Sequence, residues 1–409
     1  MSILNELGNK NSWQDFFAYK KEKTRLLKRD EEYFRDFIEK ELYKPVTDFI
    51  FNDDYCFSVP EKKLINKHGK SKKRVVYTFS EQENMVLKLM TFLLYRYDDS
   101  QPVNCYSFRR NYGVKKAIKT ILREKNIEKK YSCKLDISDY FNSINVELLL
   151  PILNELLSGD APLFRFLERL LTADKALFNG GIITEKRGAM AGIPVSQFFS
   201  NIYLAEMDRF FLNEGILYAR YSDDIIFFAD SREMLDKYLG IVLNFISEYR
   251  LTVNPEKVRI TEPGERWDYL GISFDNGKIG LSPATMRKIK GKIRRKARTI
   301  YRWKIRKEAG DSRAMRAFSR SLHRKFFGKN SKDEFTWARW FFPLINTDND
   351  LRTIDAHVQE YMRYIKTGRF NKANYRITYS DLKDCGYISL VNRYYSGKAK
   401  NGKNGVLLK

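Results

Sequence analysis

Apolar positions recur at helical spacing near both ends of the chain. Residues 1–50 place large apolar side chains among charged ones, and residues 81–96 and 340–409 repeat the pattern. Such stripes are typical of amphipathic helices that bury one face. We therefore expect helical regions at both ends, each docked on another part of the molecule.

The middle of the chain alternates β-type runs with helical stretches. The run YSCKLDIS is followed by the helical stretches VELLLPILNELL and MLDKYLGIVLNFISEY, which predicts an α+β sheet domain. Upstream, a basic loop that contains glycine separates Leu64 and Ile65 from the run Val75, Val76, Tyr77. That pattern predicts a β-hairpin with a strongly positive loop.

Two adjacent carboxylates interrupt the apolar stretch ARYSDDIIFFAD, residues 219–230. Aspartate pairs also occur at ordinary turns, so the flanking runs matter more than the pair. They predict a hairpin whose two-residue turn is centred near Ser222 and Asp223. Asp223 and Asp224 would then lie together at its tip, where a divalent cation relieves the repulsion between them.

A third carboxylate, Asp136, ends the β-type run in CKLDISDYFNSI. A strand end beside a hairpin tip can hold metal ions between carboxylates. Two-metal phosphoryl transfer needs such rigidly placed carboxylates for the attacking hydroxyl and the leaving pyrophosphate. Asp136, Asp223 and Asp224 are therefore the candidate catalytic and metal-binding residues.

A strongly basic helix is predicted from residue 283 onward. Ser282 is a plausible N-cap with Pro283 at the first helical position, and apolar residues follow at helical spacing. The other face is almost entirely Lys and Arg, including Lys292, Arg295 and Lys296. A solvated face is the alternative, but the one-sided charge favours a helix that binds a nucleic-acid backbone.

Composition points to a polyanionic partner. The chain has 75 Lys plus Arg against 51 Asp plus Glu, a formal net charge of +24, and 14% aromatic residues, which favours nucleic acid over a membrane surface. No apolar run is long enough to span a bilayer, and the start MSILNELGNK lacks a signal-peptide pattern. We expect a cytoplasmic protein. The four cysteines and three histidines show no zinc-ligand spacing.

The order of several short segments resembles the palm motifs of reverse transcriptases. After Asp136 come RGAMAGIPVSQFFSNIYLAEMD, YSDD, LTVNPEKVRI and WDYLGISF, and the resemblance covers roughly residues 72–298. It implies an α+β right-hand polymerase fold with helical extensions. The implied parts are an N-terminal extension (1–60), fingers (61–130), a palm (131–280, with a finger insertion around 150–190), and a helical thumb with the C-terminal region (281–409).

The resemblance also assigns roles at the metal site. It places two Mg²⁺ ions, for which Mn²⁺ can substitute, on Asp136, Asp223 and Asp224, with a backbone carbonyl from Ile137. Phe141 matches the aromatic gate that crowds the sugar 2′-hydroxyl and selects deoxynucleotides, although a core phenylalanine is the alternative. Lys257 matches a lysine that protonates the leaving pyrophosphate, with a surface lysine as the alternative.

Further matches surround the nucleotide. Gly188, Gly192, Ser196 and Asn201 align with small or polar residues that let the backbone approach template and incoming base. The chain departs from the family at Met190 and Ala191, where Pro-Gln is usual, and at Gln197, where Pro is common.

The finger segment SKKRVVYTF matches a triphosphate-binding motif. Arg74 is its best match, because a guanidinium can bind phosphate in a bidentate manner, and Lys73 or Lys72 would assist. The segment YSFRRNYGVKKAI places Phe108 and Arg109 near the template. Tyr269, Leu270 and Gly271 fit the turn that grips the primer.

Among reverse transcriptases, the chain looks most similar to bacterial defence-associated enzymes of the unknown groups, with the type 2 branch as one candidate. That resemblance implies reverse transcription of a neighbouring non-coding RNA, with dNTPs as substrates and cDNA as product, in defence against phage. The sequence leaves open a retron-type enzyme, whose short signatures are absent, a protein-primed or template-independent polymerase, and a non-catalytic RNA-binding scaffold. Template identity, primer type and oligomeric state also stay open.

Overall fold

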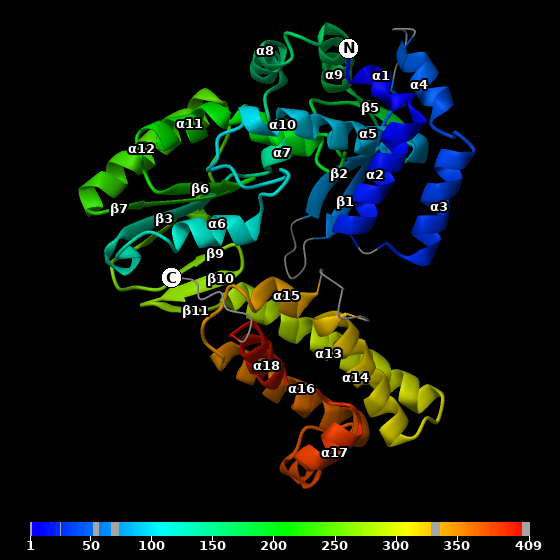
Figure 1. Cartoon of the computed structure of the whole chain (residues 1–409), viewed down its shortest axis with the longest axis vertical. Coiled ribbons are helices and arrows are strands. Elements are labelled where there is room, and N and C mark those ends of the chain that lie inside the picture. Colours follow the sequence, from blue (N-terminus) through cyan, green and yellow to red (C-terminus); the bar gives the residue numbers. More distant parts are fainter. Residues whose placement is uncertain (1, 25, 52–56, 67–72, 329–335, 403–409) are drawn as a thin grey trace. The chain divides into compact units, whose positions relative to one another are not determined.

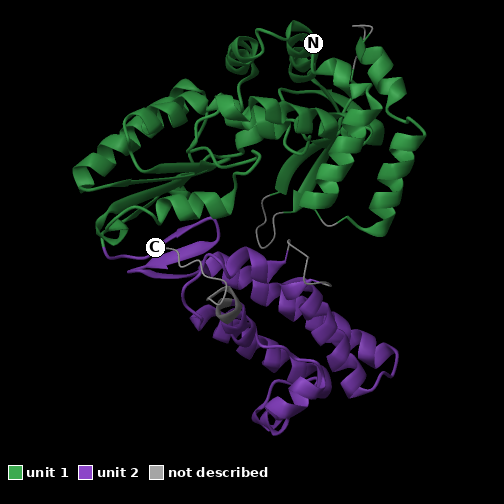
Figure 2. Cartoon of the chain, viewed as in Figure 1, with its two compact units in different colours: residues 1–263 green, residues 264–409 purple. Residues whose placement is uncertain are grey.

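The computed structural model describes residues 2–24, 26–51, 57–66, 73–328 and 336–402. The chain is α+β and divides into two compact units, Met1–Pro263 and Gly264–Lys409 (Figure 2). Among the described residues, none of the helices has an apolar stretch suited to crossing a membrane. The cysteines Cys105, Cys133 and Cys385 are buried and free.

The N-terminal helices of the first unit pack around the helix α5 (Glu81–Leu93) (Figure 1). Their apolar faces bury Leu7, Trp13, Phe16 and Phe37 in the same core as α5, so the docked helices predicted from the apolar stripe are confirmed. Ser80 and Glu83 form a capping box that starts α5. The four helices are α1 (Leu4–Leu7), α2 (Lys10–Lys23), α3 (Lys28–Glu39) and α4 (Lys44–Phe51).

A first sheet has the strand order β2-β1-β4-β5. The predicted hairpin is confirmed by the antiparallel pair β1 (Glu61–Asn66) and β2 (Lys73–Thr78). A second hairpin, β4 (Lys175–Phe178) and β5 (Gly181–Thr184), joins it through a parallel contact between Glu61 and Leu177. A segment about 100 residues downstream in sequence thus completes the sheet.

A second sheet carries the predicted metal-binding carboxylates. Its order is β6-β7-β3-β8, all antiparallel, and α12 (Arg232–Glu248) packs on β3 and β7. Cys133, Leu135, Ile225 and Phe227 are buried in its core. The strands are β3 (Tyr131–Asp136), β6 (Tyr218–Tyr221), β7 (Asp224–Ala229) and β8 (Arg259–Thr261).

Shorter helices fill the first unit between these strands. The α-helices are α6 (Val114–Ile121), α7 (Tyr140–Ser143), α8 (Val146–Leu156), α9 (Ala161–Thr172), α10 (Ser196–Tyr203) and α11 (Ala205–Asn213). The 3-10 helices are η1 (Leu94–Ser100), η2 (Ile127–Lys129) and η3 (Pro255–Lys257).

The second unit combines a small sheet with helices. Its strands β9 (Trp267–Tyr269), β10 (Ile272–Asp275) and β11 (Lys278–Leu281) form a meander. The long helices α13, α14 and α16 pack on one another. The helical elements are α13 (Pro283–Arg306), α14 (Asp311–Phe327), α15 (Trp337–Phe341), α16 (Asn349–Thr367), η4 (Lys372–Arg376), α17 (Tyr379–Asp384) and α18 (Leu390–Gly402).

The boundary between the two units falls between Pro263 and Gly264, whereas the palm limit at residue 280 stays a prediction. Among the described residues, the strands β9–β11 pair with one another and with no other strand, and they belong to the second unit. Its last strand is bound to the following helical region, because Asp350 accepts a hydrogen bond from the Leu281 N–H at 2.7 Å and Asn346 donates to the Ile279 carbonyl at 3.0 Å. These contacts are long-range in sequence, which explains why local patterns did not reveal them.

Candidate active site

The predicted hairpin turn is confirmed. Tyr221 pairs with Asp224 in the β6–β7 ladder, which leaves Ser222 and Asp223 as a two-residue turn. Ser222 adopts a left-handed conformation with φ of +60°, as a tight hairpin turn of this kind requires. The two carboxylates therefore lie at the end of an apolar hairpin whose strands are buried.

Asp136 ends β3 directly opposite Asp224 in the antiparallel register. The next residue, Ile137, donates its backbone N–H to the Asp223 carbonyl at 3.1 Å. Three carboxylates from two strands and one turn thus meet at one edge of the sheet, as the sequence predicted.

The charges at this edge are unevenly compensated. Lys257 forms an ion pair with Asp136, and Lys134 forms one with Asp224 at 3.1 Å. The pKa of Asp223 is raised, first by burial and then by the negative charges of Asp136 and Asp224. Asp223 is thus the carboxylate that gains most from added positive charge.

The carboxylates suit a hard divalent cation, which prefers oxygen ligands. Within the described ranges, no group of three or more His, Cys, Asp or Glu side chains lies in an arrangement ready to hold a metal ion. The ammonium groups of Lys257 and Lys134 lie against two of the three carboxylates. A cation would have to displace or share these contacts. At Asp223, burial and the charges of Asp136 and Asp224 raise the pKa although Lys257 partly opposes them.

Phe141 lies in α7 beside a cavity of about 360 Å³. Its side chain is half-buried, and its ring centroid lies 6.3 Å from that of Phe108. The cavity combines aromatic rings with two lysines and one loop: Phe16, Tyr19, Phe92, Tyr95, Phe108, Phe141, Lys20, Lys88 and residues 192–194, 196 and 197. Burial, and then the charge of Lys88, lowers the pKa of Lys20.

The two predicted glycines permit close approach between protein segments. A Cβ on Gly188 would lie 2.6 Å from the Asn142 carbonyl oxygen, and one on Gly192 would lie 2.8 Å from the Tyr77 oxygen. Both glycines have positive φ, +54° and +109°. In the described structure these close neighbours are protein backbone, and Gly192 also lies in the lining of the cavity beside Phe141.

Ser196 and Asn201 are buried inside the first unit. The Ser196 hydroxyl lies 2.7 Å from the carbonyls of both Met190 and Ile193, and Asn201 bonds to residues 101 and 107. The Ser196 contacts fix the loop that precedes α10, and the Asn201 contacts bind α10 to residues 101 and 107. Ser196 also lies in the lining of the cavity beside Phe141, and its contact with a nucleotide stays a prediction.

Arg109, which was predicted to lie near the template, is buried in the first unit. Its side chain is 7% exposed, and its guanidinium donates to the carbonyls of Pro102, Cys105 and Asp98. It therefore holds the loop 98–109 together, and its burial argues against contact with the template. A bonded guanidinium of this kind satisfies backbone groups that burial would otherwise leave without partners.

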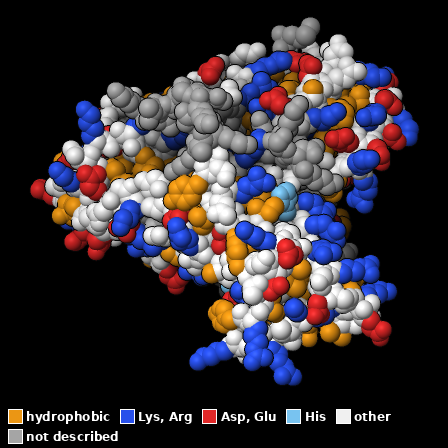
Figure 3. Space-filling model, turned by 60° about the horizontal axis from the view of Figure 1, so that its bottom comes forward, with side chains coloured by type: hydrophobic (Ala, Val, Ile, Leu, Met, Phe, Trp, Pro, Cys, Tyr) orange, Lys and Arg blue, Asp and Glu red, His pale blue; other side chains and the backbone are white. Residues whose placement is uncertain are grey.

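The other predicted cations lie at the surface. Lys73 and Arg74 are exposed on β2, whereas Lys72 lies outside the described residues. In the second unit, Lys292 and Arg295 on α13 are exposed and Lys296 is half-buried. Lys and Arg side chains are spread over much of the face shown in Figure 3, with Asp and Glu among them.

The basic side chains of α13 extend to two sides of its apolar stripe. Ile289, Ile293 and Ala297 are buried, and Ser282 caps the helix as predicted. Burial, and then the charges of Lys292 and Arg295, lowers the pKa of Lys325 on α14. These three cations therefore form one positive cluster on the side of α13 that faces α14.

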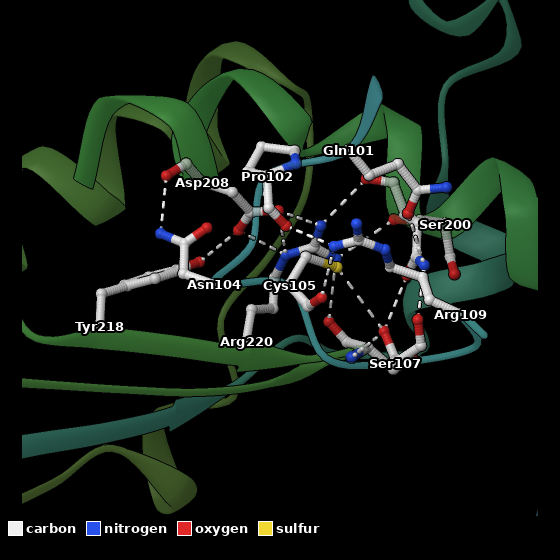
Figure 4. A network of polar contacts seen from close by, with 12 residues as sticks. Gln101, Pro102, Asn104, Cys105, Ser107, Arg109, Ser200, Asp208, Tyr218 and Arg220 are labelled. Atoms are coloured by element: carbon white, nitrogen blue, oxygen red, sulfur yellow. Dashed lines mark hydrogen bonds and ion pairs between the residues drawn. The ribbon is translucent and has the colours of Figure 1, made fainter. Parts of the chain in front are cut away.

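A buried polar network behind the hairpin was not predicted (Figure 4). Arg220 and Asp208 are completely buried and form a bidentate ion pair. The sequence did contain one sign of this network, because Arg220 is a charged residue in an otherwise apolar strand. A buried charge requires a partner of opposite charge. Its partner lies in a helix, α11, that precedes the hairpin.

Comparisons with known proteins give one family match and several similar proteins. A family profile described as reverse transcriptase (RNA-dependent DNA polymerase) matches residues 65–274. The retron Mx65 reverse transcriptase of Myxococcus xanthus is 26% identical over 178 residues, 41% of this chain and 41% of that protein. The retron Ec86 reverse transcriptase of Escherichia coli is 22% identical over 163 residues, 39% of this chain and 47% of that protein.

The matched segment thus spans less than half the length of either relative. Among solved structures, apo telomerase from Candida tropicalis superposes with a TM-score of 0.48 at 12% identity, covering 97% of this chain and 88% of that one.

Proposed function

This chain belongs to the reverse transcriptase family, and from that premise we propose that it is an RNA-directed DNA polymerase that copies an associated non-coding RNA in bacterial defence against phage. The observation that carries the proposal is the register of Asp136 opposite Asp224, with Asp223 in the adjoining turn. The retron reverse transcriptases that it resembles and its large positive charge support RNA as the template.

Reverse transcriptases use divalent metal ions. In this chain Asp136, Asp223 and Asp224 would hold them, and bound Mg²⁺ would supply positive charge for the attacking 3′-hydroxyl and the leaving pyrophosphate. The raised pKa of Asp223 supports this assignment, because burial and two neighbouring carboxylates disfavour its charge in the absence of a cation.

The remaining roles belong to side chains around this edge. Lys257 lies against Asp136 and would donate a proton to the leaving pyrophosphate. Arg74 and Lys73, both exposed, would bind the triphosphate. Phe141 would exclude the sugar 2′-hydroxyl by steric overlap, because its ring lines the cavity beside the loop that contains Gly192.

A retron-type polymerase is the second candidate. It is favoured because the relatives from both M. xanthus and E. coli are retron reverse transcriptases. Both candidates use the same carboxylates and an RNA template, and they differ in the RNA that is copied. The identity of the copied RNA therefore separates them.

The proposed activity is tested by replacing Asp223 and Asp224 with Ala. Synthesis of DNA on a primed RNA template should fall to background, because these carboxylates would position the catalytic cations. RNA binding should persist, since the exposed cations of β2 and α13 are unchanged. Primer extension in Mg²⁺ and a filter-binding assay measure the two properties.

The matched control replaces Asp15 and Asp99, two exposed aspartates elsewhere in the first unit, with Ala. It changes the net charge equally and should keep full activity. Polymerisation by the Asp223→Ala/Asp224→Ala variant at the rate of this control would refute the assignment.

A further inference from the structure

The segment 104–107 lies beside β6 as a short additional strand. The Tyr106 N–H donates to the Arg220 carbonyl at 2.9 Å, and the Arg220 N–H donates to the Asn104 carbonyl at 3.0 Å. Cys105 and Arg220 form a parallel bridge. Because the two segments run parallel, the residues two positions after this bridge, Ser107 and Ser222, also lie side by side. Ser222 belongs to the hairpin turn.

The Ser107 hydroxyl binds the turn directly. It is fully buried and accepts a hydrogen bond from the Ser222 backbone N–H at 3.0 Å. The same hydroxyl donates its single proton to Asn201 Oδ1 at 2.7 Å. Because its proton is committed to Asn201, the Ser107 oxygen is left to accept from the turn.

Asn201 fixes this orientation. Its Nδ2 donates to Gln101 Oε1 at 3.0 Å and to the Ser107 carbonyl at 2.7 Å, which leaves Oδ1 as the acceptor. The side chain is 1% exposed. Figure 4 shows Ser107, Gln101 and Arg109 within one connected network.

Arg220 holds the other backbone group of the turn residue. Its guanidinium donates to the Ser222 carbonyl at 3.4 Å while it is bound to Asp208. The Ser222 hydroxyl is buried and has no hydrogen-bond partner among the described residues. The left-handed conformation of Ser222 therefore depends on the side chains of Ser107 and Arg220, and not on its own hydroxyl.

We propose that Ser107 is a positioning residue for the catalytic turn: by accepting the Ser222 N–H, it sets the orientation of Asp223 and so the affinity of the edge for divalent cations. This inference rests on the proposed polymerase function. Asp223 follows Ser222 directly, and its carbonyl is bound by the Ile137 N–H at 3.1 Å. The turn is thus fixed on one side by β3 and on the other by Ser107.

The variants Ser107→Ala and Ser107→Cys test this role. Alanine removes the acceptor, and cysteine keeps a similar shape but accepts hydrogen bonds weakly. We expect kcat for primer extension on a defined RNA template to fall about tenfold in the alanine variant, as for other residues that orient metal ligands. The KM for dNTP should change by no more than about twofold, because the nucleotide contacts remain.

A second measurement does not depend on activity. Mg²⁺ alone should raise the unfolding temperature of the wild-type protein, since a cation bound to the folded state stabilises it. In Ser107→Ala the Mg²⁺ concentration that gives half of this rise should increase about tenfold. In Ser107→Cys the same Mg²⁺ concentration should also increase, so this variant can test the proposal even if the alanine variant fails to fold.

The matched control is Ser200→Ala. Ser200 is equally buried, but its hydroxyl bonds only to the Gln197 carbonyl of its own helix in the described contacts. It should retain wild-type kcat and Mg²⁺ dependence. The inference is overturned if the Ser107 variants match this control, or if Ser200→Ala loses as much as they do. A wild-type protein that makes no DNA would instead refute the proposed polymerase function.

Discussion

Each carboxylate at the candidate site has a different electrostatic neighbour. Asp136 meets Lys257, Asp224 meets Lys134, and Asp223 faces burial and the other two carboxylates. A divalent cation therefore competes with lysines at two positions and relieves repulsion at the third. This balance favours cation binding through Asp223, whose backbone carbonyl accepts a hydrogen bond from the Ile137 N–H.

Phe141 provides a direct test of sugar selection. Phe141→Ala should reduce the preference for dNTPs over rNTPs by about tenfold or more, because removal of the ring removes the steric overlap with a 2′-hydroxyl. The dNTP rate should fall less than the preference does. Single-nucleotide incorporation with matched dNTP and rNTP pairs measures both.

Phe92→Ala is the control for this variant. Phe92 lines the same cavity from α5, so its removal also deletes an aromatic ring. Its sugar preference should stay at the wild-type value. An unchanged preference in Phe141→Ala, or an equal loss in Phe92→Ala, would place sugar selection elsewhere.

At the residue scale, local patterns identified the acidic residues but not the buried ones. Asp136, Asp223 and Asp224 follow from a strand end and a two-residue turn, both of which are local features. Arg109 and Ser196 resemble surface or substrate-binding residues in sequence, yet their partners are carbonyls in the folded chain. Burial of a side chain depends on segments distant in sequence, so these contacts within the protein could not be predicted from local patterns.

At the element scale, the loop before α10 is fixed to both the first sheet and α7. The Tyr77 N–H donates to the Ala191 carbonyl at 2.8 Å, and the Ala191 N–H donates to Asn142 Oδ1 at 2.8 Å. Gly192 allows this approach, since a side chain there would meet the Tyr77 carbonyl. The loop thus joins the β2 strand to the residues beside Phe141.

Gly192→Ala should destabilise the protein more than Gly215→Ala. Both residues have positive φ, but space is open at Gly215. In Gly215→Ala the free energy of unfolding should fall by about 1 kcal/mol from backbone strain alone. In Gly192→Ala it should fall by about 2–3 kcal/mol because steric overlap is added. Thermal unfolding compares them. Equal shifts would mean that the backbone of Tyr77 moves away without cost.

The helix α13 is the element that local patterns predicted best. Its N-cap Ser282, first-turn Pro283 and buried stripe were all expected and are confirmed. The β4–β5 hairpin was not expected to pair with β1, because that parallel contact joins positions far apart in the sequence. Local capping and periodicity identify an element, whereas its pairing partners depend on the rest of the fold.

Neutralising Lys292, Arg295 and Lys296 with Gln should weaken RNA binding and flatten its salt dependence. If all three contact phosphates, the slope of log affinity against log salt should fall by about 2 units. Folding should persist, because Ile289 and Ile293 remain buried. Fluorescence anisotropy over a range of salt concentrations measures the slope.

The matched control is the triple Gln variant of Lys290, Arg294 and Arg298, on the side of α13 that faces α16. Their charges act on His357 and Tyr361 of that helix. In this control the slope of log affinity against log salt should fall by less than in the Lys292, Arg295 and Lys296 variant. Equal losses in the two variants would show that RNA responds to total charge and not to the cluster that includes Lys325.

At the scale of the whole molecule, the two compact units separate the acidic edge from the basic helix in sequence. The three aspartates belong to residues 1–263, and α13 belongs to residues 264–409. The proposed metal site and the proposed nucleic-acid-binding helix therefore lie in different units, and we expect variants to change one property and leave the other. The net charge of +24 adds a non-specific affinity for any polyanion, which experiments on template identity must remove.

Sequencing of copurified nucleic acid distinguishes these contributions. After washing at about 0.5 M salt, where binding through phosphate contacts alone is weak, the wild-type protein should retain one structured RNA and DNA complementary to it. The Asp223→Ala/Asp224→Ala variant should retain the same RNA without that DNA, since binding does not need the carboxylates. The Asp15→Ala/Asp99→Ala control should match the wild type in both. A mixture that mirrors total cellular RNA would show that charge alone drives binding, and complementary DNA in the double Asp223 and Asp224 variant would show that another enzyme made it.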